Sequence, residues 1–224
     1  MVQPIVPGVY QVPGVVANCY LLESGRDLAV IDAGLPYSHR AVLRLMRELG
    51  HQPESLQAIF LTHADRDHMG GAAALRAATG ARVFAGAIEG EAMAGKRVPE
   101  PASTPVGLPG PIRMAFEVTS RFLFARVNPV IPDRILADGE DLEAPLGLMA
   151  LHTPGHTPGH MSFFDAKRRI LFAGDSMRSF AGRMRPSFGA NTDNELQAQE
   201  SAWRQLTLNP ELILVGHGTP IWVK

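Results

Sequence analysis

The segment Leu61–Gly71 reads LTHADRDHMGG and places two histidines and two aspartates within six consecutive positions. These residues are His63, Asp65, Asp67 and His68. Imidazole nitrogen and carboxylate oxygen are ligands that zinc and similar divalent ions accept. In a tight loop, such side chains can turn toward two neighbouring points. A polar surface loop could carry the same residues, but their density favours a metal site with room for two ions.

This cluster falls between an expected strand and an expected helix. Residues 56–63, LQAIFLTH, form an apolar run of strand length that ends at His63, and residues 70–80, GGAAALRAATG, are typical of a helix. The cluster is therefore expected in a strand-to-helix loop. In α/β proteins such loops lie at the carboxyl ends of strands, where ligand sites are usually assembled.

The remaining sequence alternates strand and helix patterns in two similar halves. Apolar residues recur at the helical interval over Ser38–Leu49, with Gly50 in the C-cap region, and a second helix is expected over Asn194–Leu206 with Asp193 as its N-cap. The first strands are expected to be antiparallel, and the order of elements predicts layers with helices outside and sheets inside. The strand patterns are GVYQV (8–12), VVANCYLLES (15–24), DLAVIDAG (27–34), ARVFAG (81–86), GLMALHTP (147–154), HMSFFD (160–165), RILFAGD (169–175) and ELILVGHG (211–218).

Residues 95–132 are rich in proline, contain RFLFARV (121–127), and are interpreted as an insertion packed over one face of the fold. Three interpretations of this insertion stay open. It is a lid over the site, a partner surface such as a homodimer interface, or an ordered loop whose Phe116, Phe122 and Phe124 cover the core.

The composition limits the class of protein. The 224 residues, of which 46% are hydrophobic, fit one domain spanning residues 1–224. A formal net charge of -1 argues against an extended nucleic-acid surface, so a small-molecule substrate is expected. The single cysteine, Cys19, is expected to be a buried thiol. Because the sequence has neither a signal-peptide pattern nor an apolar run of about 18 residues, we expect a cytoplasmic protein without a membrane partner.

Further ligand-type residues occur in the second half. His152, His156 and His160 follow one another at intervals of four, but Pro154 and Pro158 exclude a common helix, so these histidines are expected in a turn. At most one or two of them can reach a site built elsewhere. The others are expected to bond the backbone or to orient a ligand from behind.

Asp175 and His217 each end an apolar strand pattern and stand beside glycine. A carboxylate or imidazole at the end of a buried strand needs a polar partner, because burial without one costs roughly several kcal/mol. A metal centre to which the other loops contribute ligands is such a partner. The loops are therefore expected to converge.

In this order, THADRDHMGG, TPGHTPGHMS, FAGDS and VGHG, with IDAG upstream, resemble the five motifs of the metallo-β-lactamase superfamily over nearly the entire chain. The resemblance implies an α/β (α+β) fold, a four-layer αββα sandwich with a dinuclear metal centre at one edge of its sheets. It implies that His63, Asp65 and His156 hold the first metal, that Asp67, His68 and His217 hold the second, that Asp175 bridges the two, and that Asp32 fixes the cluster loop. Of the other turn histidines, His160 is expected to orient a ligand from behind.

Asp65 departs from the pattern most frequent in this superfamily, His-x-His-x-Asp-His. Three aspartates and a bridging hydroxide would bring four negative charges against the four positive charges of two divalent ions. We therefore expect two divalent ions, with zinc first and with manganese or iron(II) also tolerated, because the first site has a harder donor set. Acidification of bound water should also be weaker.

The chemistry that the resemblance implies is attack by a metal-bridging hydroxide on a small-molecule ester, thioester or lactone, with Asp67 taking a proton. The motif HTPGHTPGH with FAGD most resembles the glyoxalase II-like branch, although the helical domain that helps to bind glutathione there has no place in these 224 residues. Arg178, Arg183 and Arg185 could hold a carboxylate or phosphate of the substrate. Two alternatives stay open: a phosphodiesterase or nuclease, which Asp65 favours, and a mononuclear-iron persulfide dioxygenase or non-catalytic metal-binding module.

Overall fold

The computed structural model describes residues 3–95, 127–142, 147–180 and 182–223. Most of the expected insertion at 95–132, with its three phenylalanines and the RFLFARV segment up to Arg126, lies outside these residues. At the described end of this insertion, Val130 is buried in the hydrophobic core of the first half of the chain, whereas Ile131 is exposed. The choice between a lid and a partner surface therefore stays a prediction.

The first half of the chain forms a six-stranded sheet with the order β1-β2-β3-β4-β5-β6. The first three strands pair antiparallel, as their turn-bounded apolar runs predict, and β3 to β6 pair parallel. Parallel strands have their carboxyl ends at the same edge of the sheet. The strands are β1 (Val9–Gln11), β2 (Tyr20–Ser24), β3 (Asp27–Ile31), β4 (Leu56–Phe60), β5 (Arg82–Gly86) and β6 (Arg134–Leu136).

The second half forms another six-stranded sheet, with the order β14-β13-β10-β9-β8-β7. In this sheet β10 and β13 are parallel, and the other pairs are antiparallel. A separate two-stranded sheet, β11 (Met177–Phe180) with β12 (Arg183–Pro186), follows β10. The strands of the large sheet are β7 (Asp141–Leu142), β8 (Leu148–His152), β9 (Met161–Asp165), β10 (Ile170–Gly174), β13 (Leu212–Val215) and β14 (Ile221–Trp222).

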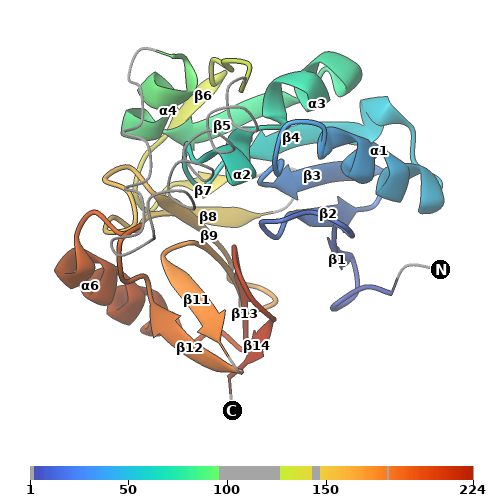
Figure 1. Cartoon of the computed structure of the whole chain (residues 1–224). Coiled ribbons are helices and arrows are strands. Elements are labelled where there is room, and N and C mark those ends of the chain that lie inside the picture. Colours follow the sequence, from blue (N-terminus) through green and yellow to red (C-terminus); the bar gives the residue numbers. More distant parts are fainter. Residues whose placement is uncertain (1–2, 96–126, 143–146, 181, 224) are drawn as a thin grey trace, which may run out of the picture.

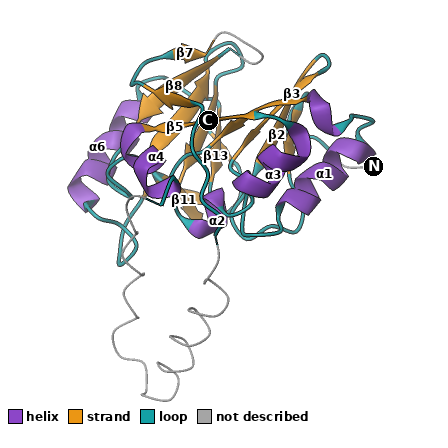
Figure 2. Cartoon of the chain, turned by 90° about the horizontal axis from the view of Figure 1, so that it is seen from above, coloured by secondary structure: helices purple, strands orange, loops and turns teal. Residues whose placement is uncertain are grey.

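Helices cover the outer faces of the two sheets, which confirms the four-layer sandwich (Figures 1 and 2). Helix α1 (His39–Glu48) buries Val42, Leu45 and Met46 against the first sheet, each worth about 1.5–3 kcal/mol by removal from water. Helix α3 (Ala72–Thr79) lies on the same face, and α6 (Glu195–Leu206) packs against the second sheet through Ala202. The remaining helical segments are η1 (Pro53–Ser55), α2 (Arg66–Met69) and α4 (Ala87–Met93).

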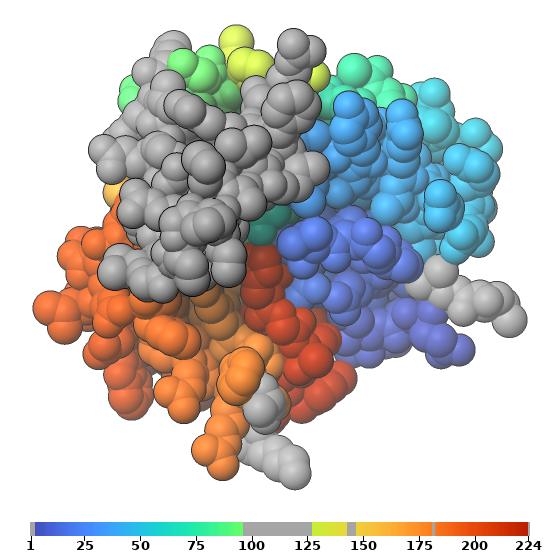
Figure 3. Space-filling model, viewed as in Figure 1, coloured from blue at the N-terminus to red at the C-terminus, as the bar shows by residue number. Residues whose placement is uncertain are grey.

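One core lies between the first sheet and its helices, and a second lies between the second sheet and α6. A third core lies between the two sheets. Its largest members are the aromatic rings of Phe60, Phe84, Phe163 and Phe172, and the ring of Phe60 lies 5.0 and 5.2 Å from those of Phe84 and Phe163. These residues alternate along their strands with residues that face the helices, so each sheet is apolar on both faces. Figure 3 shows the N-terminal half, blue to cyan, beside the orange and red C-terminal half.

Two local expectations were wrong. The ligand cluster is not all loop, because Asp67 and His68 lie within the one-turn helix α2. The N-cap of α6 is Asn194 instead of Asp193, since the side chain of Asn194 accepts a hydrogen bond from the backbone N–H of Gln197. Among the described residues no helix is long and apolar enough to cross a membrane. Cys19 is buried and carries a free thiol, as expected.

Candidate metal centre

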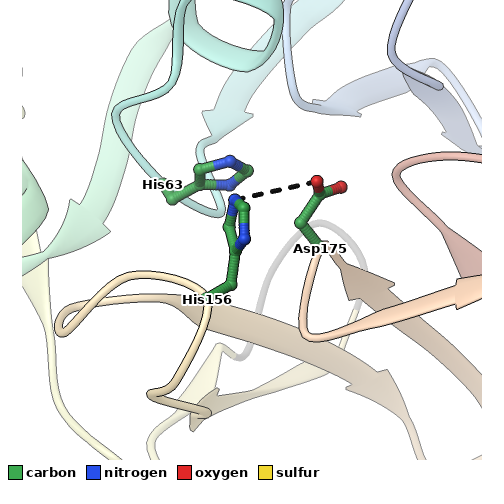
Figure 4. A group of neighbouring side chains, drawn as sticks. All are labelled: His63, His156 and Asp175. Carbon is green, nitrogen blue, oxygen red and sulfur yellow. Dashed lines mark ion pairs between the residues drawn. The ribbon is translucent and has the colours of Figure 1, made fainter. Parts of the chain in front are cut away.

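The carboxyl ends of strands from both sheets bring a first group of ligand-type side chains together. His63 follows β4, His156 lies in the turn between β8 and β9, and Asp175 follows β10 directly. One ligand atom from each lies within 4.8 Å of the others, and all three residues are buried. Figure 4 shows both imidazoles and the carboxylate pointing toward one another. His156 Nε2 stands 3.7 Å from Asp175 Oδ2.

A second group adjoins the first and consists of Asp67, His68 and His217, again within 4.8 Å of one another. His217 follows β13, and its Nε2 lies 3.2 Å from Asp67 Oδ2 and 3.4 Å from His68 Nε2. Asp175 stands between the two groups, because its Oδ1 is 3.4 Å from His68 Nε2 while its Oδ2 faces His156 and His217. This is the position that a bridging carboxylate requires.

Asp65 lies at the open side of the first group. Its Oδ2 is 3.3 Å from His156 Nε2 and 3.5 Å from His63 Nε2. The Asp65 side chain is 41% exposed, whereas that of His63 is fully buried. The structure therefore places all seven residues expected to hold metal in one continuous cluster.

Three of the four imidazoles of this cluster are held through Nδ1, which leaves Nε2 facing inward. His68 Nδ1 donates to Asp32 Oδ2 over 2.8 Å. His63 Nδ1 lies 2.9 Å from Thr62 Oγ1, whose only hydrogen is directed to Asp32, so His63 is the donor in that contact. His156 Nδ1 lies 3.3 Å from Ser187 Oγ. Fixing the far nitrogen in this way orients the near lone pair toward an ion.

Asp32 is thus the support of two imidazoles, one directly and one through Thr62. It follows β3 with a left-handed backbone, φ 60°, a conformation that aspartate tolerates better than most residues. Its carboxylate also accepts from the Thr62 backbone N–H at 2.9 Å. Asp32 therefore bonds both the start of the loop that carries the cluster and one of its imidazoles.

His160 lies behind the cluster, bonded to Asp175 and with its ring centroid 5.1 Å from that of His63. Its Nε2 accepts from the backbone N–H of Asp175 at 3.0 Å, and its Nδ1 lies 2.9 Å from Thr153 Oγ1. Burial lowers the pKa of His160 well below its usual value, and the neighbouring His63 and His156 lower it further. With both nitrogens engaged, neutral His160 holds Asp175 from behind. His152 instead bonds the carbonyl of Pro158.

Glu89 in α4 is a member of the site's support that the sequence did not indicate. Its side chain is buried, with the residue only 3% exposed. Oε2 accepts from the backbone N–H of Ala64 at 2.8 Å, and Oε1 accepts from Thr157 Oγ1 at 2.8 Å and from the Gly159 N–H at 3.0 Å. One carboxylate therefore ties the His63 loop to the His156 loop.

The electrostatics of the cluster suit a cation. Burial alone would raise the pKa of Asp175 and of Asp65, but the histidines beside them hold both pKa values well below the usual range. Burial would lower the pKa of His68, but Asp32 and Asp175 raise it well above its ordinary value. The carboxylates are consequently ionised at neutral pH, and an ion that binds here displaces imidazole protons.

Two further observations test whether these residues fit divalent ions. His63 Nε2 and Asp175 Oδ1 are buried atoms without a hydrogen-bond partner among the described residues, and both point into the cluster. Four ligands at 2.0–2.1 Å around a tetrahedral ion stand about 3.3 Å apart. Several pairs of ligand atoms here are separated by 3.2 to 3.7 Å, and all the ligand atoms of each group lie within 4.8 Å of one another. The donor set and its spacing therefore fit.

A cavity of about 260 Å³ opens over the cluster. Of the three arginines expected near the substrate, only Arg178 lines it, with Nη2 3.6 Å from Asp175 Oδ2. Arg183 and Arg185 lie on the neighbouring strand β12. Asn191 also lines the cavity and was not indicated by the sequence. The lining residues are Asp65, Asp67, His156, Asp175, Arg178, Asn191 and His217.

Comparison with known proteins accounts for this arrangement. The sequence profile of the metallo-beta-lactamase superfamily matches residues 12–217, from the residue after β1 to the last ligand-type histidine. The chain belongs to the metallo-β-lactamase superfamily. Proteins of this superfamily are generally hydrolases that bind divalent metal ions.

One relative and two solved structures illustrate the likeness within the metallo-β-lactamase superfamily. The chain is 27% identical to hydroxyacylglutathione hydrolase GloC of Haemophilus influenzae, over 90% of this chain and 85% of the relative. It matches metallo-beta-lactamase family protein TTHA1429 of Thermus thermophilus with a TM-score of 0.74 and 28% identity, over 97% of this chain and 76% of that one. It also matches TTHA1623, solved in a di-iron-bound form, with a TM-score of 0.67 and 26% identity, over 99% and 94% of the two chains.

Proposed function

We propose that the protein is a two-metal hydrolase that cleaves a small-molecule ester, thioester or lactone. The observation that carries this proposal is the pair of adjacent ligand groups with the Asp175 carboxylate between them. A single ion would not need seven converging ligand-type side chains. The likeness to hydroxyacylglutathione hydrolase GloC supports a thioester or a related carbonyl substrate.

In this proposal the first ion is held by His63, Asp65 and His156, and the second by Asp67, His68 and His217. Asp175, whose carboxylate stands between the two groups, would be shared by both ions. Divalent ions bound there would supply Lewis acidity that makes water nucleophilic at neutral pH and polarises the scissile carbonyl. Zinc, manganese and iron(II) are all compatible with the mixed nitrogen and oxygen donors, and the di-iron form of TTHA1623 supports iron as a candidate.

The chain's own polar groups line the reaction space. Asp67 faces the cavity with a side chain that is 29% exposed, and its carboxylate is placed to take the proton that the attacking water loses. Burial alone would raise the pKa of Asp67, but His217 and His68 lower it, so this carboxylate is an acceptor at neutral pH. Arg178 and Asn191 are positioned to contact the substrate.

Hydrolysis by purified, metal-quantified protein tests the proposal. We expect two equivalents of a divalent metal and, in a panel of thioesters, lactones and phosphodiesters, turnover of a thioester or a lactone. Asp175→Asn should lower both metal content and turnover, because the bridging carboxylate loses its charge. Asp141→Asn, an exposed aspartate in β7, is the matched control.

Three results would refute the proposal in different ways. Full turnover in protein proven free of metal would exclude the metal-dependent reaction. Turnover of phosphodiesters alone would assign the protein to the other substrate class, and oxygen consumption with glutathione persulfide would show a dioxygenase.

A further inference from the structure

The β11–β12 hairpin presents all three of its arginines on one face. Arg178 pairs with Arg185, and Phe180 pairs with Arg183. Opposed residues of an antiparallel pair share a face, and so do alternate residues along each strand. The hairpin face defined by Arg178, Phe180, Arg183 and Arg185 is called the arginine face below. The alternation of arginines with other residues along β11 and β12 therefore follows from strand geometry, which turns alternate side chains to opposite faces.

The opposite face of the hairpin is anchored to the fold. Met177 is fully buried in the core beneath α6, and Met184 packs against the same core. The Ser179 backbone N–H donates to the carbonyl of His217 over 3.2 Å. Because these contacts fix one face against the second sheet and the His217 loop, the arginine face is turned outward, with Arg178 at the metal cavity.

Arg178 is only partly satisfied by its neighbours. Its Nη2 stands 3.6 Å from Asp175, longer than the roughly 2.7–2.9 Å of a charge-assisted hydrogen bond. Its buried Nε has no hydrogen-bond partner among the described residues. The side chain is 26% exposed, and it lines the cavity together with Asn191. The guanidinium therefore has donors available next to the reaction space.

Arg185 adds a second, exposed guanidinium directly opposite Arg178. Like charges at directly opposed positions destabilise a sheet, so stability does not explain the pair. Within the described part of the chain no carboxylate forms an ion pair with Arg183 or Arg185. The Cβ atoms of opposed residues stand about 4.5–5.5 Å apart, so two guanidinium groups can hold one anion between them.

We propose that the arginine face is a subsite for a carboxylate or phosphate group of a small-molecule substrate, next to the metal cavity. This inference rests on the proposed hydrolase function and adds to it a preference for anionic substrates. Three arginines on one short hairpin form a small basic surface, which suits one carboxylate or phosphate group. The formal net charge of -1 supplies no extended basic field for a nucleic acid.

Paired substrates of equal length test this subsite, one carrying a terminal carboxylate and the other a neutral amide at the same position. We expect the wild-type protein to prefer the carboxylate by about tenfold in kcat/KM, with the preference falling at high salt. Arg178→Ala and Arg185→Ala should bring the ratio toward one, chiefly by raising KM for the carboxylate substrate. Arg178→Lys should restore part of it, since a lysine keeps the charge but not the planar fork.

Arg44→Ala is the matched control, because this exposed arginine of α1 lies far from the hairpin (Figure 1). It should leave the ratio unchanged. Arg185 is exposed, so Arg185→Ala keeps the test valid if Arg178→Ala does not fold. Turnover of both substrates with a ratio near one in wild type and variants would overturn the subsite while leaving the hydrolase intact.

Binding of inorganic phosphate to the metal-loaded protein, measured by calorimetry, is independent of turnover. We expect Arg185→Ala to weaken binding by about tenfold relative to Arg44→Ala. Equal affinities would overturn the subsite even if no hydrolysis substrate were found. A single-stranded oligonucleotide that binds more tightly than phosphate, and loses affinity in Arg185→Ala, would overturn the assignment to a small molecule.

Discussion

Replacing Glu89 by glutamine would separate the support of the metal centre from the ligands themselves. The amide keeps one oxygen, which can still accept from Thr157 and Gly159, but its NH₂ group would face the N–H of Ala64. A hydrogen bond to a charged group contributes about 1.5–3 kcal/mol, and a buried donor left without a partner costs about 1–3 kcal/mol. We expect Glu89→Gln to lower the free energy of unfolding by about 3 kcal/mol, or a Tm fall of roughly 6–12 °C.

The same substitution should weaken metal binding without touching a ligand. Ala64 lies between His63 and Asp65, and the two donors to Oε1, Thr157 and Gly159, lie in the turn that carries His156. Loss of a group that orients metal ligands typically costs about 10–100-fold in metal affinity. Competition with a chromophoric chelator measures that affinity, and thermal unfolding by circular dichroism measures the stability.

Glu91→Gln provides the control, because Glu91 lies two residues further along α4 with its side chain exposed. It should match the wild type in both assays. If Glu89→Gln also kept the wild-type Tm and metal affinity, the reasoning would fail. A lower Tm with unchanged metal affinity would show that Glu89 supports the fold but does not position the ligand loops.

Three other substitutions probe the site. Gly216→Ala would drive a Cβ into Asp175 Oδ1, so we expect the folded variant to bind less metal, and full metal content in elemental analysis would contradict this. Asp65→His replaces a hard oxygen donor by nitrogen and should shift metal competition from manganese and iron(II) toward zinc; unchanged selectivity would count against it. Burial, with His63 and His156, depresses the pKa of His160 in the folded protein. The contribution of neutral His160 to the stability of the metal-free protein is therefore complete above the unfolded pKa of about 6.5. It is lost as the pH falls toward the folded pKa, by up to about 1.4 kcal/mol per pH unit. His160→Gln should flatten that dependence in urea unfolding between pH 7 and 5, and equal slopes would refute the assignment.

Three of the ligand-type residues were predictable because each of them follows a strong local pattern. His63, Asp175 and His217 follow continuous apolar runs that become β4, β10 and β13. Parallel pairing brings such strand ends to one edge, so the sequence alone indicates that they converge. Whether each side chain binds an ion stays a prediction, although the structure brings all of them together.

Glu89 could not be found in the same way. It lies in the short segment AIEGEAM, where nothing in the pattern distinguishes it from Glu91. Its burial arises because α4 packs beside the loops of both sheets, a tertiary arrangement that no local spacing encodes. Asn191 is a comparable case, since an isolated polar residue in a loop gives no periodic signal.

Short elements were missed for a related reason. Strands β6, β7 and β14 have only two or three residues and exist through pairing with a longer neighbour. The β11–β12 hairpin did carry a signal, because MRSF and RMRP are two short runs separated by Ala181 and Gly182 in the sequence. The arginines alternate with other residues along both runs, and this alternation is a signal separate from their charge.

Each ligand group takes residues from both sheets, His63 with His156 and Asp175, and Asp67 and His68 with His217. Neither half of the polypeptide therefore holds a complete coordination sphere during translation. A nascent chain that has released only its first sheet can offer only part of each group, so full loading would have to wait until the ribosome has delivered β13 and the loop after it. Metal uptake would in this way report that synthesis and docking of the two halves are finished.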